Sequence, residues 1–258
     1  MMKRRKLIRY AGTGLLASLA AGLSSNWQRG MAQTGGSVSV KWLGHTCFLF
    51  SGDGQQILVN PFRPGGCTAG YQPPMVQANL VLISSQLLDE GATDGLPGNP
   101  RLLYEPGVYQ VEGKQFQGLQ LIHDREGGRR FGFNVAWKWT QGGVNILHLG
   151  GAASPIAIEQ QILMGRPDLL LLPVGGGPKA YNPQEALQAV RALNPKMVIP
   201  THYRTSAAAA DACDLVAVDE FLNLVGNSSV RQINSNSITI SGADLPSSGP
   251  VISVLSYR

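Results

Sequence analysis

The amino-acid sequence predicts an α/β fold, an αββα layered sandwich with two packed β-sheets and helices outside. Residues 37–151 consist of strand-like segments with almost no helical periodicity, and from Ser154 onward buried strands alternate with helical segments. Charged residues make up only 14% of the 258 residues, and 32 residues are glycine. Low charge is typical of strands buried on both faces, and abundant glycine is typical of tight connections.

The first 32 residues have the pattern of an export signal. A basic head that includes Arg4-Arg5 precedes an apolar stretch from Tyr10 to Leu23 and a small-residue cleavage site at Gly30-Met31-Ala32. The paired arginines indicate the twin-arginine (Tat) type, which carries folded proteins. An apolar stretch of 14 residues is too short to span a bilayer core of roughly 30 Å, so we expect cleavage and no stable membrane span. An uncleaved membrane anchor is the alternative.

Removal of this signal leaves 258 − 32 = 226 residues, which we interpret as a single domain over residues 33–258. The signal holds six Lys and Arg and no acid, so the remainder has 21 − 6 = 15 basic and 16 acidic residues. The positive net charge therefore belongs to the signal, and we expect no nucleic-acid partner. The expected location is a periplasm or a thylakoid lumen.

The first half of this domain is predicted to be strands. Residues 37–44 alternate between polar and apolar side chains, and Gly52-Asp53-Gly54 predicts a hairpin turn. Residues 79–84 form a short apolar run, which indicates an interior strand, whereas residues 91–100 are rich in glycine and proline, which indicates a loop. The strands predicted in this half cover residues 37–44, 46–52, 56–62, 79–84, 101–111, 114–124, 131–140 and 143–151.

Three helices are predicted in the second half. Ser154 can cap a helix, Pro155 suits its first turn and Gly165 can end it, so residues 154–165 are predicted helical. Residues 183–194 place their apolar side chains on one face, and residues 214–226 also have a helical pattern. The strands predicted in this half cover residues 168–174, 196–200, 229–233, 237–242 and 251–257.

The three cysteines, Cys47, Cys67 and Cys213, have neither metal-binding nor redox spacing. We expect three buried structural thiols. One disulfide with a remaining thiol is the alternative, since an exported protein meets an oxidising compartment.

All four histidines of the chain, His45, His123, His148 and His202, follow or end apolar runs. The carboxylates of Asp89 and Glu90 come just after the predicted strand 79–84. Loops at strand ends can be shaped while the sheet holds them rigidly, so ligands and metals collect there. The simpler interpretation is that the histidines are hydrogen-bonded side chains and that the carboxylates start a loop or cap a helix.

These residues stand in motifs with a specific resemblance. The segments "WLGHTCFLF", "ILVNPF", "VLISSQLLDEG", "LIHDREGGRRFGFNVAW", "ILHLGG", "DLLLLPVGGG" and "NPKMVIPTHYRT" follow one another in the order of a known family. The chain resembles the metallo-β-lactamase fold, in its branch of zinc-dependent hydrolases similar to L-ascorbate-6-phosphate lactonase and to the N-acyl-phosphatidylethanolamine phospholipase. The resemblance covers the chain after the signal and implies the αββα fold.

The family's metal-binding hallmark is a strand ending in Ser-His-x-His-x-Asp-His, completed by a later His, a bridging Asp and a final His. By resemblance, Ser85 and Leu87 replace the first two metal-binding histidines, and Glu90 replaces the last histidine of the hallmark. Gly151 replaces the bridging aspartate. Asp89, His123 and His202 are kept, so four of seven ligand positions are replaced. The family's strand-ending Asp-Pro is also changed, to Asn60-Pro61.

The replacements set the expectations for metal binding. A catalytic zinc needs about three protein ligands, and the first ion would be left with His123 alone. The second ion would keep Asp89 and His202, with Glu90 as a substitute ligand. In this family His45 occupies a position behind the ligands, where it can also be packing support, and we expect His148 to be structural.

Three functional hypotheses follow from these residues. The main hypothesis is an exported protein that keeps the fold without catalysis and binds a small-molecule ligand or an unknown protein partner, with no cofactor. The alternative is a hydrolase of an ester, lactone or phosphoester that uses one divalent metal, zinc or manganese, with Asp89 as its catalytic residue. Metal-free acid–base chemistry through Asp89 and a neighbouring histidine is a third possibility.

Overall fold

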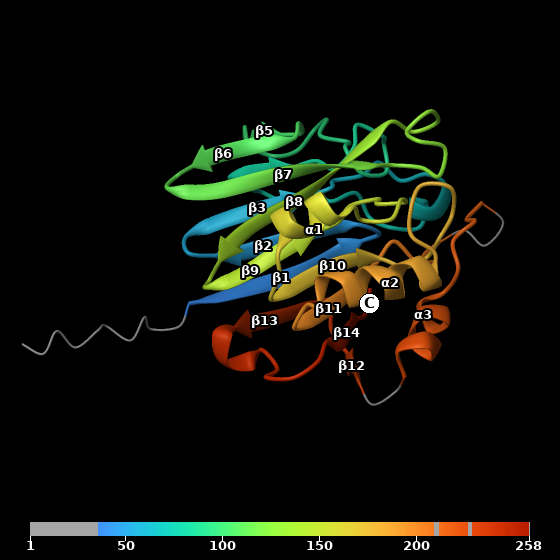
Figure 1. Cartoon of the computed structure of the whole chain (residues 1–258). Coiled ribbons are helices and arrows are strands. Elements are labelled where there is room, and N and C mark those ends of the chain that lie inside the picture. The colour runs from blue at the N-terminus through green and yellow to red at the C-terminus, as the bar shows by residue number, and fades with distance from the viewer. Residues whose placement is uncertain (1–35, 209–211, 227–228, 258) are drawn as a thin grey trace, which may run out of the picture. The chain divides into compact units, whose positions relative to one another are not determined.

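Two mixed β-sheets pack against each other in the computed structural model, which describes residues 36–208, 212–226 and 229–257 (Figure 1). The predicted signal of residues 1–32 lies outside the described residues. In the part of the chain that is described, no helix combines the length and apolar character needed to cross a bilayer.

The first sheet has six strands in the order β13-β1-β2-β3-β4-β5. Neighbours from β13 to β3 are antiparallel, whereas β3, β4 and β5 are parallel to one another. The strands are β1 (Ser37–Gly44), β2 (Cys47–Gly52), β3 (Gln55–Val59), β4 (Leu80–Leu82), β5 (Arg101–Leu103) and β13 (Ser237–Ser241). The predicted interior strand at residues 79–84 is β4, shorter at both ends and paired on both sides.

The second sheet has eight strands in the order β12-β14-β11-β10-β9-β8-β7-β6. The strands from β12 to β9 are parallel, and those from β9 to β6 are antiparallel. They are β6 (Gly107–Val111), β7 (Lys114–Ile122), β8 (Phe133–Gln141), β9 (Val144–His148), β10 (Leu169–Pro173), β11 (Met197–Thr201), β12 (Val230–Ile233) and β14 (Val251–Leu255). The predicted sandwich of two sheets is confirmed.

Side chains that alternate along the strands form two apolar layers, one on each face of the six-stranded sheet. In β3, Ile57 and Val59 point into the main core between the sheets, whereas Leu58 points to the opposite face. Successive side chains of a strand alternate between faces, so a continuous apolar run supplies both layers. Loops cover the outer layer on this side, since Phe62, Tyr71 and Ile83 pack there.

Helices accompany the eight-stranded sheet (Figure 1). They are α1 (Ile158–Met164), α2 (Pro183–Leu193) and α3 (Val218–Val225). Helix α2 confirms the predicted segment: the Asn182 side chain accepts a hydrogen bond from the backbone N–H of Glu185, and Asn194 follows the last turn in a left-handed conformation. Short 3₁₀ turns lie at Gly66–Thr68 and Gly242–Asp244.

The other two helices begin later than the sequence predicts. Tyr181 Oη donates to the carbonyl of Ser154, which holds this residue outside α1. Residues 214–217 are extended, because the N–H of Val216 bonds to Gly175 and the N–H of Arg204 bonds to the carbonyl of Val216. Tertiary hydrogen bonds therefore override the helical pattern at both starts.

The expectation of three buried structural thiols is wrong. Cys67 and Cys213 form a disulfide, and Cys47 is a buried free thiol. The two cysteines are 146 residues apart in sequence, and the fold brings the loop after β3 beside the loop after β11. Sequence spacing cannot reveal such a long-range pair.

Candidate metal centre

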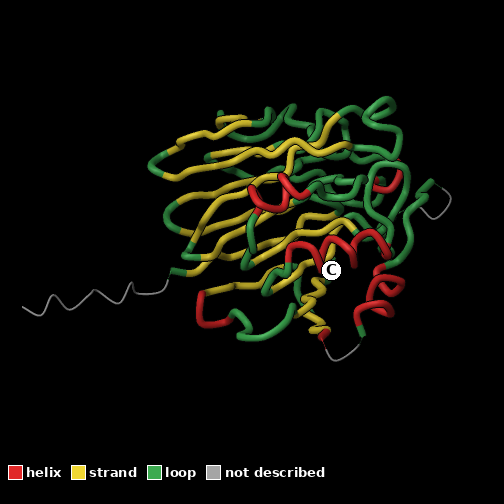
Figure 2. The backbone as a smooth tube through the Cα atoms, in the orientation of Figure 1, coloured by secondary structure: helices red, strands yellow, loops and turns green. Residues whose placement is uncertain are grey.

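The candidate residues gather where strands of the two sheets end. Strands β1, β3 and β4 run in the same direction in the first sheet, and β7, β9, β10 and β11 do so in the second. Their carboxyl ends therefore meet at one edge of the sandwich, where loops collect (Figure 2). The residues that follow these ends include His45, Asn60, Asp89, Glu90, His123, Lys179 and His202.

His45 and His202 meet across the sandwich in strained turns. Their ring centroids are 4.2 Å apart, and both residues have positive φ, 53° and 52°. Trp42 Nε1 donates to the carbonyl of His45 at 3.0 Å, which fixes the turn after β1. Non-glycine residues rarely adopt such φ values, and packed structure that enforces them is common at functional sites.

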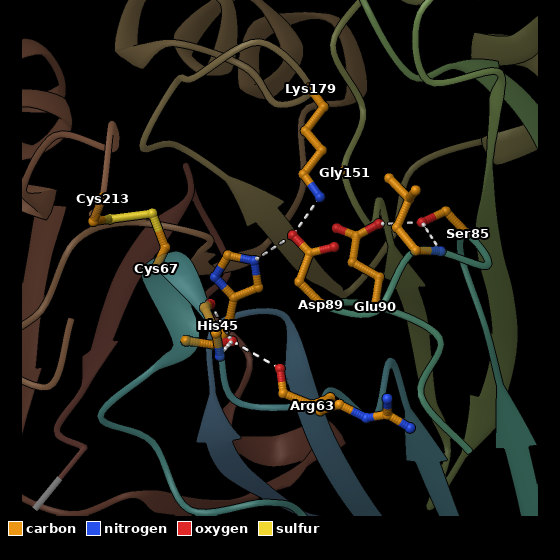
Figure 3. A network of polar contacts seen from close by, with 12 residues as sticks. His45, Arg63, Cys67, Ser85, Asp89, Glu90, Gly151, Lys179 and Cys213 are labelled. Carbon is orange, nitrogen blue, oxygen red and sulfur yellow. Dashed lines mark hydrogen bonds and ion pairs between the residues drawn. A yellow bond between two sulfur atoms is a disulfide. The ribbon is translucent and has the colours of Figure 1, made fainter. Parts of the chain in front are cut away.

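Asp89 is held between two nitrogens. Figure 3 shows Lys179 reaching toward Asp89 from one side and His45 from another. Lys179 Nζ donates to Asp89 Oδ2, and His45 Nε2 lies 3.7 Å from the same oxygen. Burial acts to raise the pKa of Asp89, but His45 and the Lys179 charge outweigh it and hold this pKa below its usual value. Asp89 is therefore an ionised carboxylate.

Glu90, the next residue, is fully buried beside His123. Ser85 Oγ donates to Glu90 Oε2 at 3.1 Å, and His123 Nε2 lies 3.5 Å from that oxygen. Burial raises the pKa of Glu90 to about 7 and lowers that of His123 to about 4. Ser85, which replaces a histidine of the hallmark, thus orients the carboxylate of Glu90.

Gly151 leaves the space that the Glu90 carboxylate uses. A Cβ atom added to Gly151 would lie 2.8 Å from Glu90 Oε1 and would collide with His123 Nε2. Asn134 Oδ1 accepts the N–H of Gly151 at 2.9 Å and fixes this close approach. By the resemblance described above, residue 151 is the bridging aspartate in relatives. The carboxylate lost at Gly151 is therefore returned to the same space by Glu90.

Three donors converge within the described part of the chain: ring nitrogens of His45 and His202 and a carboxylate oxygen of Glu90 lie within 4.8 Å of one another. All three residues are buried. Both ring nitrogens of His45, Nδ1 of His202 and Oε1 of Glu90 have no hydrogen-bond partner among the described residues. Burial without a partner costs free energy, so such a cluster fits a cation.

This donor set differs from the set predicted from the sequence. The prediction combined Asp89 with Glu90 and His202, but the Asp89 carboxylate is engaged by Lys179. His45, predicted to lie behind the ligands, joins the donor set instead. Burial, with the neighbouring His45, lowers the pKa of His202 well below its usual value, so its imidazole is neutral and can coordinate a metal.

The remaining two histidines lie beside this set. His148 Nε2 is 3.0 Å from the carbonyl of Thr46, and its Nδ1 accepts the N–H of Gly150, which agrees with the predicted structural role. His123 is not part of the converging set, but its Nε2 lies 3.5 Å from Glu90 Oε2. Neither of its ring nitrogens has a hydrogen-bond partner among the described residues.

Sequence reasoning missed Lys179. It lies in the loop "GGGPKAYNP" after β10, and the only available signal was its place at a strand end. Arg125, in the turn after β7, donates to the carbonyls of Gly177 and Ala180 and pairs with Glu185. Arg125 therefore restrains the loop that carries Lys179 on both sides of this residue.

A cleft of about 570 Å³ opens onto the donors. The residues that line it include His45, Asp89, Lys179 and His202 and the apolar residues Leu87, Leu88, Phe131 and Leu215. Its volume is in the usual range of ligand pockets. The disulfide cysteine Cys67 also lines this cleft.

Comparison with known proteins assigns the family. Residues 39–202 match the β-lactamase superfamily domain, and this segment runs from within β1 through β11 and contains every residue of the donor set. The chain belongs to the β-lactamase superfamily.

Relatives in this superfamily have the name UPF0173 metal-dependent hydrolase. The chain is 31% identical over 193 residues to one from Methanoculleus marisnigri, which covers 66% of this chain and 83% of the relative. It is 30% identical over 216 residues to one from Thermococcus onnurineus, which covers 74% of this chain and 93% of the relative.

A crystal structure of a metallo-β-lactamase superfamily protein from Thermotoga maritima has a similar fold. The TM-score is 0.68 at 28% identity, and the match covers 85% of this chain and all of that chain. The predicted metallo-β-lactamase resemblance is thus confirmed at the level of the superfamily.

Proposed function

We propose that this protein is a hydrolase that uses one divalent ion, held by His45, Glu90 and His202, against a neutral ester or lactone. The convergence of three buried donors within 4.8 Å supports the proposal most directly. The relatives named metal-dependent hydrolases also support it. This is the alternative hypothesis drawn from the sequence, with His45 in place of Asp89 as a ligand.

The donor chemistry fits zinc best. Two imidazoles and one glutamate form the ligand set of several catalytic zinc sites, in which a fourth position stays open to water or substrate. A bound divalent ion supplies Lewis-acid polarisation and a water of lowered pKa. The cleft gives that position access to a ligand.

Asp89 is the group available to orient the attacking water. Its carboxylate is ionised and lies beside His45, so it can accept a hydrogen bond from a water near the donor set. Glu90 and His202 would hold the ion, and Ser85 would keep the Glu90 carboxylate in place. Apolar side chains of the cleft, such as Leu87 and Phe131, would exclude bulk water from the reacting bond.

The cleft favours an uncharged substrate over a phosphoester. Its described cationic lining residues are Arg63 and Lys179, and each is already paired, with Asp94 and Asp89 respectively. Phosphate recognition needs cations free to donate charge-assisted hydrogen bonds. A neutral acyl compound with an apolar substituent makes no such demand.

The non-catalytic hypothesis depends on the replaced hallmark positions. Ser85 and Leu87 supply no imidazole, which supports the loss of one ion. However, Glu90 supplies the carboxylate missing at Gly151, and His45 adds a nitrogen to that of His202. Three donors therefore remain for the other ion. The hydrolase therefore explains more of the geometry than a binding protein does.

We also propose that the protein is exported. The disulfide between Cys67 and Cys213 supports this location, because disulfides persist in oxidising compartments and are rare in the cytosol. Fractionation of the native cells with a specific antibody tests it. Recovery of the protein with the cytoplasmic fraction would contradict export.

Metal content and turnover test the hydrolase directly. Protein purified without a metal-binding tag is expected to hold one equivalent of zinc by elemental analysis. Glu90→Gln should lower zinc affinity at least 100-fold in calorimetric titration, because it removes the only anionic donor of the set. Neutral aryl esters and aliphatic lactones should be hydrolysed faster than aryl phosphodiesters, and a chelator should abolish this activity.

The matched control is Glu126→Gln, which changes an exposed glutamate outside the cleft and should bind zinc as the wild type does. Wild-type protein without stoichiometric metal, or full zinc binding by Glu90→Gln, would overturn the proposed site. Preferential turnover of phosphodiesters would keep the hydrolase but refute the neutral substrate.

A further inference from the structure

We infer that the Lys179 ammonium is a built-in replacement for the second metal ion of the superfamily's two-metal centre, so that this cleft admits one ion. The inference deepens the proposed function and rests on it for the first ion. It gives Lys179 a positioning role that neither the resemblance nor the relatives' names assign. Lys179 would supply one fixed positive charge where a two-metal hydrolase binds a cation.

The first support is the place of Lys179 within the centre. Its side chain is 16% exposed and its Nζ bonds to Asp89, the hallmark carboxylate kept in this sequence (Figure 3). By the resemblance, that aspartate binds a metal ion in relatives. An ammonium therefore occupies one coordination direction of the aspartate that would otherwise face a second cation.

The second support is the buried pair formed by Glu90, the residue after Asp89, and His123. Glu90 directly follows Asp89, the partner of Lys179, and both Glu90 and His123 are fully buried. His123 Nε2 and Glu90 Oε2 lie 3.5 Å apart. Asp89 and the Glu90–His123 pair are thus groups that a second cation would contact, and Lys179 already supplies a positive charge at Asp89.

The third support is that the ammonium is held firmly. The Arg125 guanidinium bonds to the carbonyls of Gly177 and Ala180, on either side of Lys179. The Lys179 Nζ also lies 6.0 Å from the centroid of the Phe131 ring. A flexible surface lysine would have neither restraint, and a fixed charge is what a substitute for a bound ion requires.

Electrostatics then predicts what happens when this charge is removed. The Asp89 side chain, which is 26% exposed, would lose the cation paired with it, and a carboxylate without its paired cation is a ligand for another cation. With Lys179 changed to an uncharged side chain, Asp89 and the nearby His123 and Glu90 oxygen should attract a divalent ion. Metal stoichiometry should therefore rise when the lysine is removed.

The experiment measures bound zinc in wild type, Lys179→Met and Lys179→Arg by elemental analysis and calorimetric titration. Methionine keeps the length of the side chain without its charge, whereas arginine keeps the charge. We expect one equivalent in the wild type and in Lys179→Arg, and one additional equivalent in Lys179→Met. Adding Asp89→Asn to Lys179→Met should remove the additional ion, because it removes the carboxylate that binds it.

Two equivalents in the wild type would overturn the inference whether or not any variant folds. No additional ion in folded Lys179→Met, judged by circular dichroism, would also overturn it. A wild type without metal would refute the proposed function. In that case, one bound ion in Lys179→Met would still support the inference, and no bound ion would overturn it. The two ideas can therefore fail separately.

Discussion

At the scale of single residues, two adjacent carboxylates have opposite electrostatic environments. Asp89 is paired with Lys179 and beside His45, which hold its pKa below the usual value, whereas burial raises the pKa of Glu90 to about 7. Neighbouring positions thus provide one carboxylate whose ionised form is favoured and one whose ionised form burial disfavours. This division agrees with roles for Asp89 toward water and for Glu90 toward a metal.

The first prediction concerns the space beside Gly151. Gly151→Ala should place a methyl group against Glu90 Oε1 and His123 Nε2, and the strain should cost ~1–3 kcal/mol of unfolding free energy. Zinc affinity should fall at least 10-fold, because the carboxylate is displaced. Denaturant titration and calorimetry measure the two effects.

Gly242→Ala is the matched control, because a Cβ there meets no atom within 4 Å. It should leave both quantities close to those of the wild type. Unchanged stability and zinc affinity in Gly151→Ala would show that the Glu90 carboxylate does not depend on this space.

The second prediction concerns the pH dependence contributed by His148. Burial lowers its pKa to about 3 in the folded protein, against about 6.5 in an unfolded chain. The unfolded state therefore binds more protons between these values, so His148 contributes stability above pH 6.5 that is lost as pH falls toward 3. Removing it should reduce the pH slope of the unfolding free energy by about 1.4 kcal/mol per pH unit in that window.

Comparison of His148→Gln with the wild type at pH 4–7, both with chelator, measures this slope by urea titration. Glutamine does not titrate, and its amide offers a donor and an acceptor for the two backbone contacts of His148. Parallel pH profiles for the two proteins would contradict the assignment.

At the scale of elements, the site is built from loops that the sheets hold in place. The loop at residues 124–131 illustrates this, because the Asp124 carboxylate accepts the backbone N–H groups of Glu126, Gly128, Arg130 and Phe131. Burial opposes ionisation, but these four bonds lower the pKa of Asp124 to about 2. A turn fixed in this way can position Arg125 for its contacts with the Lys179 loop.

The third prediction tests that contact. Arg125→Met should loosen residues 175–183, because it removes the donors to Gly177 and Ala180 and the ion pair with Glu185. We expect amide hydrogen exchange in this segment to accelerate at least 10-fold, with little change in the strands. Mass spectrometry of peptides from exchanged protein locates the effect.

Arg129→Met provides the control, since the Arg129 side chain donates only to Glu126 within its own turn in the described contacts. Exchange over residues 175–183 should match the wild type in this variant. Equal protection of the segment in both variants would mean that Arg125 does not fasten the loop.

The elements differ in how far the sequence could predict them. Helix α2 was predicted correctly because its amphipathic face is a local signal. The predicted starts of α1 and α3 were wrong because hydrogen bonds with residues distant in sequence decide them: Tyr181 Oη donates to Ser154, and the carbonyl of Gly175 accepts the N–H of Val216. Similarly, the strand ends located the site, but only packing of the two sheets brings His45 beside His202 and Lys179 onto Asp89.

At the scale of the whole molecule, a covalent link joins loops of early and late chain segments beside the cleft. The disulfide between Cys67 and Cys213 closes a loop across 146 residues, which contains β4 to β11, two strands of the first sheet and six of the second. Cross-linking of distant residues restricts the unfolded chain most strongly when the loop is long. Its contribution should therefore appear in global stability.

The fourth prediction is that reduction destabilises the entire fold. Removing the disulfide should lower the unfolding free energy by about 2–5 kcal/mol. Guanidinium titration of the wild type with and without a thiol reductant measures this loss, and Cys67→Ser with Cys213→Ser should give the reduced value in both conditions.

Cys47→Ala serves as the control, because Cys47 is a buried free thiol. This variant should keep the full response to the reductant whatever its own stability is. A wild type whose midpoint is insensitive to reductant would show that the link does not stabilise the folded state.

The shared space of Gly151 and Glu90 also constrains the order in which this centre can change. An aspartate introduced at position 151 while Glu90 is present would force two carboxylates against each other, since even a Cβ there approaches Glu90 Oε1 to 2.8 Å. A shorter or different side chain at position 90 must come first, or both codons must change together. Attempts to rebuild a dinuclear enzyme on this scaffold therefore face an epistatic barrier, and single reversions at position 151 should be recovered as inactive proteins.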